Sequence, residues 1–203
     1  MRRIVTVVFC LLAGLVWGDE PRPPLPALYA VTGVAADDLL NVRAAPDGSA
    51  EVIGTLPHDA EGIEVITLSR EGNWAAVNII ERQGWVAMRF LRATVMPKNA
   101  FGLPAALQCF GTEPFWDITF TTDGQIRLNT PEGNGCHDVL STAPPADFVD
   151  LARGSFRFQW RDKSTRVTAH ILPGTCYDGM SDRAYGLHYI DDHGPRIGCC
   201  SLN

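Results

Sequence analysis

Cysteine is the residue type with the most chemistry to offer in this chain. Six cysteines occur, and five of them lie in the second half, at positions 109, 136, 176, 199 and 200. In an oxidising compartment such cysteines form disulfides that stabilise small domains. Cys199 and Cys200 are adjacent in what should be a strand, where neighbouring side chains point to opposite faces. The two are therefore poorly placed to bond each other.

Each of these neighbours then needs a partner of its own. Cys109 begins the first strand of the second half and Cys176 ends the loop before the last hairpin, and we expect these two to be the partners. Strand register decides which neighbour bonds to which partner, and the sequence leaves that open. Cys136, in the loop around Gly133–His137, is left unpaired.

Two further groups contain residue types used in catalysis. Cys136, His137 and Asp138 are nucleophile, base and acid types, but consecutive residues of an extended segment alternate faces and cannot converge as a triad. Asp178 and Asp182 have the chemistry of a glycosidase pair or a calcium site. Aspartates in a glycine-containing loop more often form turns, so we assign no catalytic residue and predict that the protein is not an enzyme.

Three histidines, His170, His188 and His193, together with reduced cysteines, make a metal site conceivable. Their spacing matches no structural zinc pattern, and exported thiols oxidise instead of binding metal. We therefore assign no metal site and no cofactor. A periplasmic metal-binding or redox-responsive protein remains the alternative function.

The N-terminus has the layout of a secretory signal peptide over residues 1–18. A basic start, Met1–Arg3, precedes the apolar run Ile4–Val16, which is shorter than the roughly 20 residues of a membrane-spanning helix. Cys10 is a poor lipid-attachment site, because Phe9 precedes it and it lies inside the apolar run. We expect cleavage after Gly18, no stable membrane span afterwards, and residence in the periplasm or outside the cell.

The charge of the chain argues against one class of partner. The formal net charge is −6 at pH 7, and removal of residues 1–18 takes away two arginines and no acidic residue. Nucleic-acid binding needs clustered Lys and Arg that neutralise phosphates. We therefore expect no nucleic-acid partner.

Proline and glycine divide the remaining chain into two domains. Residues 19–27 contain four prolines, which remove backbone donors, and predict an extended linker. A second break at residues 94–106 is marked by Pro97, Gly102 and Pro104. The predicted domains are residues 28–93 and 107–203.

Residues 28–93 contain short β-rich runs separated by turns, which predicts a small barrel. Four motifs stand in register: Leu40–Pro46, Val52–Leu56, Gly72–Val77 and Gly84–Val86. In order and spacing they resemble the bacterial SH3 (SH3b) domain. The resemblance implies an envelope-binding module, whose partner would be peptidoglycan or an envelope peptide or protein.

Two residues of this domain are candidate ligand contacts. Trp74 follows a Glu-Gly-Asn turn at a loop edge, where an amphipathic ring suits a peptide or a sugar. Arg43 lies where a loop leaves a strand and has the charge to meet a carboxylate. Trp85, in a Gly-Trp-Val strand, is expected in the core.

The second domain shows strand alternation with an aromatic face. Trp116, Ile118 and Phe120 alternate with polar residues, and so do Phe156, Phe158 and Trp160. About six strands are expected in all, with no sustained helical period. They predict an antiparallel β barrel or sandwich closed by disulfides.

Three motifs of this half are Gly111–Trp116, Cys176–Tyr185 and Gly198–Cys200. They resemble a family of uncharacterised bacterial envelope proteins, often lipoproteins, that share EPFW, C-x-DGMSD and GCC. The resemblance covers residues 107–202 and implies no activity. The complete prediction is an all-β protein, a small SH3-like barrel followed by a disulfide-closed β domain, that acts as a non-catalytic binding or adaptor protein of the cell envelope.

Overall fold

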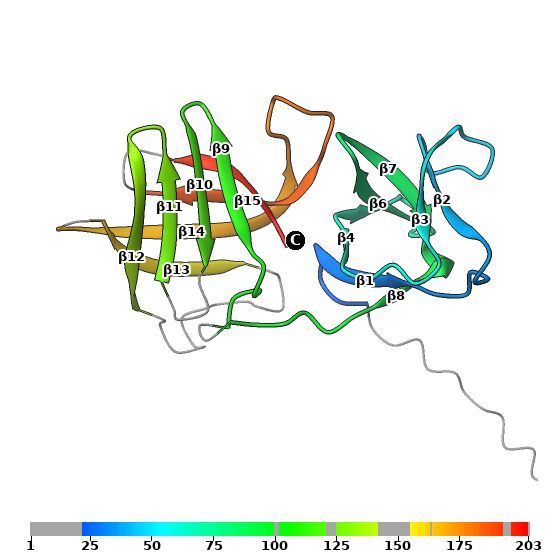
Figure 1. Cartoon of the computed structure of the whole chain (residues 1–203), viewed down its shortest axis with the longest axis horizontal. Helices are drawn as coiled ribbons and strands as arrows, with labels where there is room; N and C mark the ends of the chain where they lie inside the picture. The colour runs from blue at the N-terminus through cyan, green and yellow to red at the C-terminus, as the bar shows by residue number, and fades with distance from the viewer. Residues whose placement is uncertain are drawn as a thin grey trace, which may run out of the picture.

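The computed structural model describes residues 22–99, 102–120, 125–141, 155–162, 164–192 and 196–202. The predicted signal peptide and the start of the proline-rich linker lie outside these ranges. The described residues form two β units side by side, with the C-terminal residues between them (Figure 1). One short 3-10 helix, Met88–Phe90, is the helical element within these ranges, and none of their helices has the length and apolar character to cross a membrane.

The first unit is a small SH3-like barrel of two antiparallel sheets, ordered β4-β1-β8 and β3-β2-β7-β6-β5. Its core is built from short apolar side chains, including Val42, Val65, Val77 and Val86, each no more than 1% exposed. Valine suits this position because its branched side chain packs well on a pleated sheet. The strands are β1 (Ala27–Val31), β2 (Leu39–Arg43), β3 (Val52–Pro57), β4 (Ile63–Val65), β5 (Thr67–Leu68), β6 (Trp74–Ile79), β7 (Arg82–Ala87) and β8 (Leu91–Ala93).

The second unit is a closed antiparallel barrel of eight strands, in the order β10-β11-β12-β13-β14-β15-β16-β9. The expected number of about six was too low: β9, where Cys109 was expected to begin a strand, is separate from β10, and β12 shows no clear alternation in sequence. Cys136 and His137 lie in β12, not in a loop. The strands are β9 (Gln108–Thr112), β10 (Phe115–Phe120), β11 (Gln125–Thr130), β12 (Gly133–Ser141), β13 (Phe156–Asp162), β14 (Thr165–Cys176), β15 (Tyr185–Asp191) and β16 (Ile197–Ser201).

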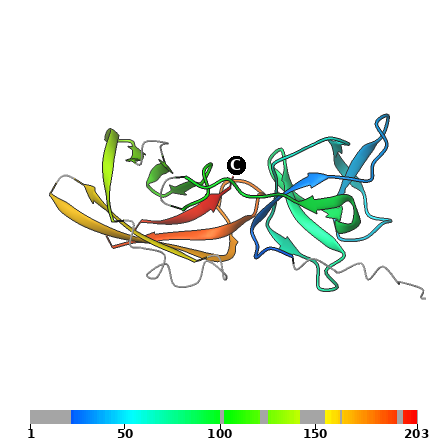
Figure 2. The same cartoon turned by 90° about the horizontal axis from the view of Figure 1, so that it is seen from below.

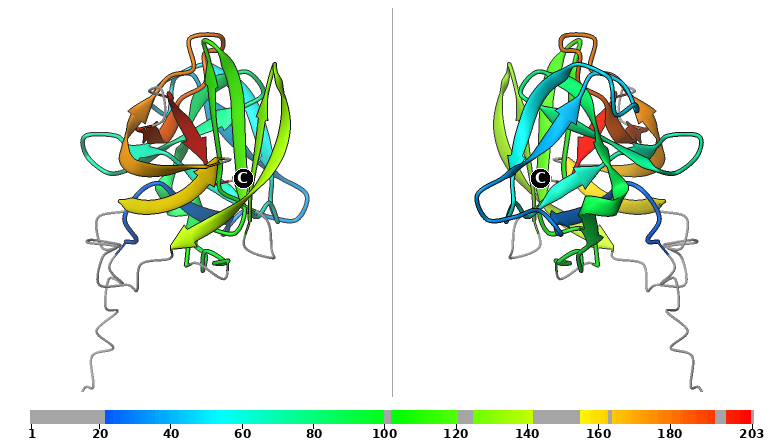
Figure 3. Two further views of the ribbon diagram at one scale, coloured as in Figure 1. Left: turned by 90° about the vertical axis from the view of Figure 1, so that its left-hand side faces the viewer. Right: turned by 90° about the vertical axis from the view of Figure 1, so that its right-hand side faces the viewer.

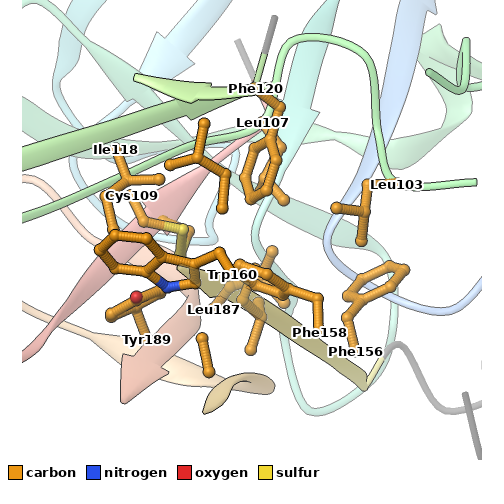
Figure 4. Packing of buried hydrophobic residues seen from close by; sticks show 14 of the residues in the cluster. Leu103, Leu107, Cys109, Ile118, Phe120, Phe156, Phe158, Trp160, Leu187 and Tyr189 are labelled. Atoms are coloured by element: carbon orange, nitrogen blue, oxygen red, sulfur yellow. A yellow bond between two sulfur atoms is a disulfide. The ribbon is translucent and has the colours of Figure 1, made fainter. Parts of the chain in front are cut away.

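Aromatic side chains fill this second barrel. The left view of Figure 3 shows the barrel backbone from the end that lies away from the first unit. Trp160, Phe158 and Tyr189 lie among aliphatic residues from several strands (Figure 4). Phe158 and Phe120 meet edge to face, with ring centroids 5.2 Å apart. The alternating residues that the sequence places on one face of each strand are the ones buried here.

The segment after β8 crosses from one unit to the other and then packs against the second barrel (Figure 2). Leu103 and Leu107 are almost completely buried in the barrel core, and Met96 packs against it. Residues 94–106, expected to be a linker, therefore contribute to the core of the unit that follows them.

The described end of the proline-rich segment also lies on the protein. Pro26 is buried, and a side chain at Gly186 of β15 would come within 2.7 Å of its Cβ. Leu25 packs against the core of the first unit. Residues 22–27 thus join the two units, in contrast to the free tether that their prolines suggested.

The loop between β14 and β15, which belongs to the second unit, also connects the two units by hydrogen-bonding to the first. The Gln83 backbone N–H donates to the carbonyl of Asp182 (2.9 Å), and the Asp182 N–H donates to the carbonyl of Glu81 (3.0 Å). Trp85 packs, half-buried, with Ile66, Ala76 and Ala184 at this contact. Trp85 is therefore part of the junction between the units and not of the core of the first unit.

Candidate ligand-binding site

Trp74 is the first residue of β6, and a tight turn places it. The Gly72 N–H donates to the Ser69 carbonyl (2.8 Å), and Gly72 has a φ of 72°, a conformation that glycine adopts without steric cost. The Ser69 hydroxyl oxygen accepts a hydrogen bond from the Trp74 N–H (3.2 Å). The turn leaves the Trp74 ring half-buried at the surface, which is the position that its loop-edge location predicts.

Two hollows meet at this ring. One has a volume of about 690 Å³ and the other about 590 Å³, and Trp74, Ala87 and Arg89 line both. We call the pair of hollows the Trp74 site. It lies entirely on residues of the first unit and of the segment that precedes it.

Arginine is the main charged residue of the Trp74 site. Arg22, Arg89 and Arg92 line the larger hollow, and Arg43 lines the smaller one together with Asp38, the one acidic residue of the two linings. None of the ion pairs within the described ranges involves these four arginines. On a chain of net charge −6, this clustering makes a local region of positive potential.

Three of the arginines also have structural contacts, and one of them, Arg89, lies with its guanidinium 4.6 Å from the centroid of the Phe90 ring. Arg43 Nη1 donates to the Ala50 carbonyl at 2.6 Å, which ties down the loop between β2 and β3. Arg22 Nη1 donates to the Gly72 carbonyl at 3.2 Å, which brings the proline-rich segment to the Trp74 turn. Each guanidinium group has five N–H donors, so all three retain donors for a ligand.

A buried phenol completes the larger hollow. Tyr29 is almost fully buried, and burial raises the pKa of its hydroxyl, with Arg22 acting in the opposite direction. The group therefore stays neutral at physiological pH. The Trp74 site offers a flat aromatic surface, guanidinium donors and a neutral phenol, which suit a ligand with carboxylates and apolar groups.

The aspartates with possible catalytic or calcium chemistry, Asp178 and Asp182, make structural hydrogen bonds. Asp178 Oδ1 accepts from the backbone N–H groups of Met180 and Ser181 (both 2.9 Å), and Oδ2 accepts from the Ser181 hydroxyl. Hydrogen bonding to the turn lowers the pKa of the Asp178 carboxyl against the opposing effect of burial. Asp178 forms the turn, whereas the backbone of Asp182 binds the first unit.

The four cysteines expected in disulfides form two bridges. Cys109 bonds to Cys200 and Cys176 bonds to Cys199. Pairing of β9 with β16 sets Cys109 directly opposite Cys200, so strand register decides the partner that the sequence left open. The side chain of Cys136 lies outside the described residues.

The histidines do not come together in the described ranges. His170 and His188 lie on β14 and β15, where His170 is paired with Ile190 and His188 with Leu172. His193 lies outside the described residues. Within the part of the chain that the structure describes, no three His, Cys, Asp or Glu residues are close enough to hold a metal ion.

Sequence reasoning missed three of the four arginines of the Trp74 site. Arg89 lies in the short 3-10 helix and Arg92 in β8, and neither belongs to a recognisable motif. Arg22 lies 50 residues before Gly72, whose carbonyl it binds.

Comparison with protein-family models, with curated proteins and with solved structures found no match for this chain.

Proposed function

We propose that the protein is an exported, non-catalytic binding protein of the cell envelope. Its first unit would bind a carboxylate-bearing peptide, such as the peptide stems of peptidoglycan, at the Trp74 site. The observation that carries the proposal is the position of Trp74 as the shared wall of two hollows lined by four arginines.

The chemistry of the site supports this ligand class. Guanidinium groups bind carboxylates with paired hydrogen bonds, and an indole ring gives a peptide or sugar an apolar surface at little entropic cost. Arg89 lines both hollows, so a ligand lying across Trp74 would meet it from either side. The resemblance of this unit to SH3b domains points to the same class of ligand.

Two features support a location in the envelope. The basic and apolar residues of 1–18 have the layout of a secretory signal, and the two disulfides suit an oxidising compartment. A periplasmic or secreted protein would meet peptidoglycan directly.

The test is co-sedimentation of the full chain with purified peptidoglycan, comparing wild type with Trp74→Ala and with Val95→Ala. Val95 is 92% exposed and lies outside both hollows, so its substitution is a matched control for loss of surface apolar area. We expect Trp74→Ala to reduce the bound fraction severalfold and Val95→Ala to leave it unchanged. Equal binding by Trp74→Ala with an unchanged circular dichroism spectrum would refute the proposed site.

A further inference from the structure

A row of side chains crosses the outer face of the second barrel. Cross-strand register sets Asn129 opposite Asp117, Asp117 opposite Phe110, Phe110 opposite Cys199 and Cys199 opposite His188. Directly opposed residues of antiparallel strands point to the same face. Their neighbours Cys109, Ile118, Leu128, Leu187 and Cys200 fill the core, so the row faces outward.

Two adjoining hollows follow this row. One, of about 460 Å³, is lined by Asn129, Asp117 and Phe110, and the other, of about 340 Å³, by Phe110, Cys199 and His188. Both also contain Gly111, Thr112 and Asp178. Five strands spaced about 4.8 Å apart give the row a length of about 19 Å. We call the two hollows together the outer groove.

Exposed apolar side chains border the outer groove. Phe115 lines the first hollow and Tyr177 and Ile197 line the second, with exposed fractions of 56%, 67% and 63%. The floor beneath them is also apolar, since Phe110 packs edge to face against Tyr185 and both contact the Cys176–Cys199 bridge. A cluster of such residues on an exposed face is characteristic of a binding site.

The first hollow contains hydrogen-bond acceptors, the Asp117 carboxylate and the Asn129 amide oxygen, beside the indole N–H of Trp116. The Asn129 side-chain N–H group donates to both carboxylate oxygens of Asp117, at 2.9 and 3.1 Å, which leaves the Asn129 amide oxygen without a donor in the described structure. The hydroxyls of Thr112 and Thr130 already donate to backbone carbonyls. A ligand with hydroxyl groups, which both donate and accept, suits this mixed lining.

All three motifs of the second half meet in this groove. Close packing explains the glycines of these motifs: a Cβ at Gly111 would clash with the ring of Trp116, and one at Gly198 would clash with the backbone carbonyl of Phe110. The loop after Cys176 is attached by the Thr112 hydroxyl, which donates to the Asp178 carbonyl at 3.0 Å. The motifs thus build one surface, which is separate from the Trp74 site on the other unit.

We infer that the outer groove is a saccharide-binding site and that its ligand is a short stretch of glycan chain. A sugar has hydroxyl and amide donors around its ring and an apolar C–H face, which match acceptors and aromatic side chains in one hollow. The length of the groove suits a ligand of several linked sugars. The inference does not depend on what the Trp74 site binds.

The probe for this inference is the N-acetylglucosamine tetrasaccharide, titrated calorimetrically into the full chain. Phe115→Ala removes an aromatic contact and should weaken the binding of the tetrasaccharide by about tenfold. Phe115 is more than half exposed, so this substitution should leave the near-UV circular dichroism spectrum unchanged. Val95→Ala, at an exposed position outside every hollow, should bind the tetrasaccharide as tightly as wild type.

A second pair of variants separates a sugar from a cationic ligand. Asp117→Asn keeps an oxygen acceptor but removes the charge, so tetrasaccharide affinity should stay within threefold, whereas Asp117→Ala should weaken it by about tenfold. The inference is overturned if millimolar tetrasaccharide gives no saturable binding. It is overturned equally if trilysine binds in its place and Asp117→Asn abolishes that binding.

Discussion

The side-chain amide of Asn78 in the first unit forms two hydrogen bonds with the backbone of Ala184 in the second unit. Its side-chain nitrogen donates to the Ala184 carbonyl at 2.8 Å, and its side-chain oxygen accepts from the Ala184 N–H at 3.1 Å. Ala184 is fully buried, so water cannot replace these bonds. The side chain of one residue thus satisfies both polar groups of a loop residue of the other unit.

Asn78→Ala should therefore destabilise the whole protein, because it leaves a buried N–H and a buried carbonyl unsatisfied. The expected loss in free energy of unfolding is about 1–3 kcal/mol, measured by urea denaturation. Glu81→Ala is the control, since only the backbone of Glu81 contacts the second unit. A loss of equal size in both variants would contradict the role given to the Asn78 amide.

Charge at the Trp74 site should govern the affinity for acidic peptides. Arg89→Ala should weaken the binding of a glutamate-rich peptide by up to about fivefold, the value of one exposed ion pair, and raised salt should reduce the difference. The control is Arg70→Ala, an exposed arginine of the same unit outside both hollows. Titration calorimetry at two salt concentrations measures the effect. Equal affinities of the two variants would exclude Arg89 as a contact.

The two disulfides should stabilise the chain to different extents. They span 91 residues (Cys109–Cys200) and 23 residues (Cys176–Cys199). The loss of chain entropy in the unfolded state predicts contributions of about 4.6 and about 3.4 kcal/mol. Urea denaturation of Cys109→Ala/Cys200→Ala and of Cys176→Ala/Cys199→Ala measures both. A larger loss for the second pair would show that loop size does not dominate.

Glu64 should make stability fall as pH rises from acid towards neutral. Its Oε2 accepts hydrogen bonds from the Ser201 hydroxyl (2.6 Å) and the Leu202 N–H (3.2 Å), and Oε1 has no partner. Burial raises the pKa of this carboxyl, although both hydrogen bonds and Arg183 lower it. The folded state thus holds the proton more tightly than the unfolded chain, whose glutamate has a pKa of about 4.3.

Glu64→Gln removes the titration and keeps an oxygen that can accept from Ser201. We expect the variant to be as stable as wild type at acid pH and more stable above the folded pKa. Thermal denaturation from pH 4 to 8 measures the difference. An advantage of the variant that grows towards acid pH would give the opposite sign and contradict the prediction.

Export should leave a mature N-terminus near Asp19. Mass spectrometry of the periplasmic fraction measures the mass directly, and Gly18→Pro, which blocks the cleavage site, is the matched variant. The wild-type chain should lose residues 1–18 and the variant should retain them. An intact Met1 terminus on wild-type protein in the cytoplasm would rule out export.

Alternation along the chain was enough to predict most of the strands and their buried faces. In β10 the inward residues Trp116, Ile118 and Phe120 are those that alternate with polar ones, because a strand turns every second side chain to the same face. The strand β12 was missed, since Gly133 and Gly135 interrupt any such pattern. Its place depends on pairing with β11 and β13, which is a property of the closed barrel.

The sequence by itself determined the all-β class, the cysteines available for pairing and the surface position of Trp74. Only the tertiary structure decided which cysteine bonds to which, because register across β9 and β16 sets Cys109 opposite Cys200. It also decided the composition of both candidate sites. Arg22 reaches Gly72 across 50 residues, and Asn129 and His188 join one groove through strand pairing. Contacts between residues so far apart depend on chain folding as a whole, and local patterns of hydrophobicity and charge carry no information about them.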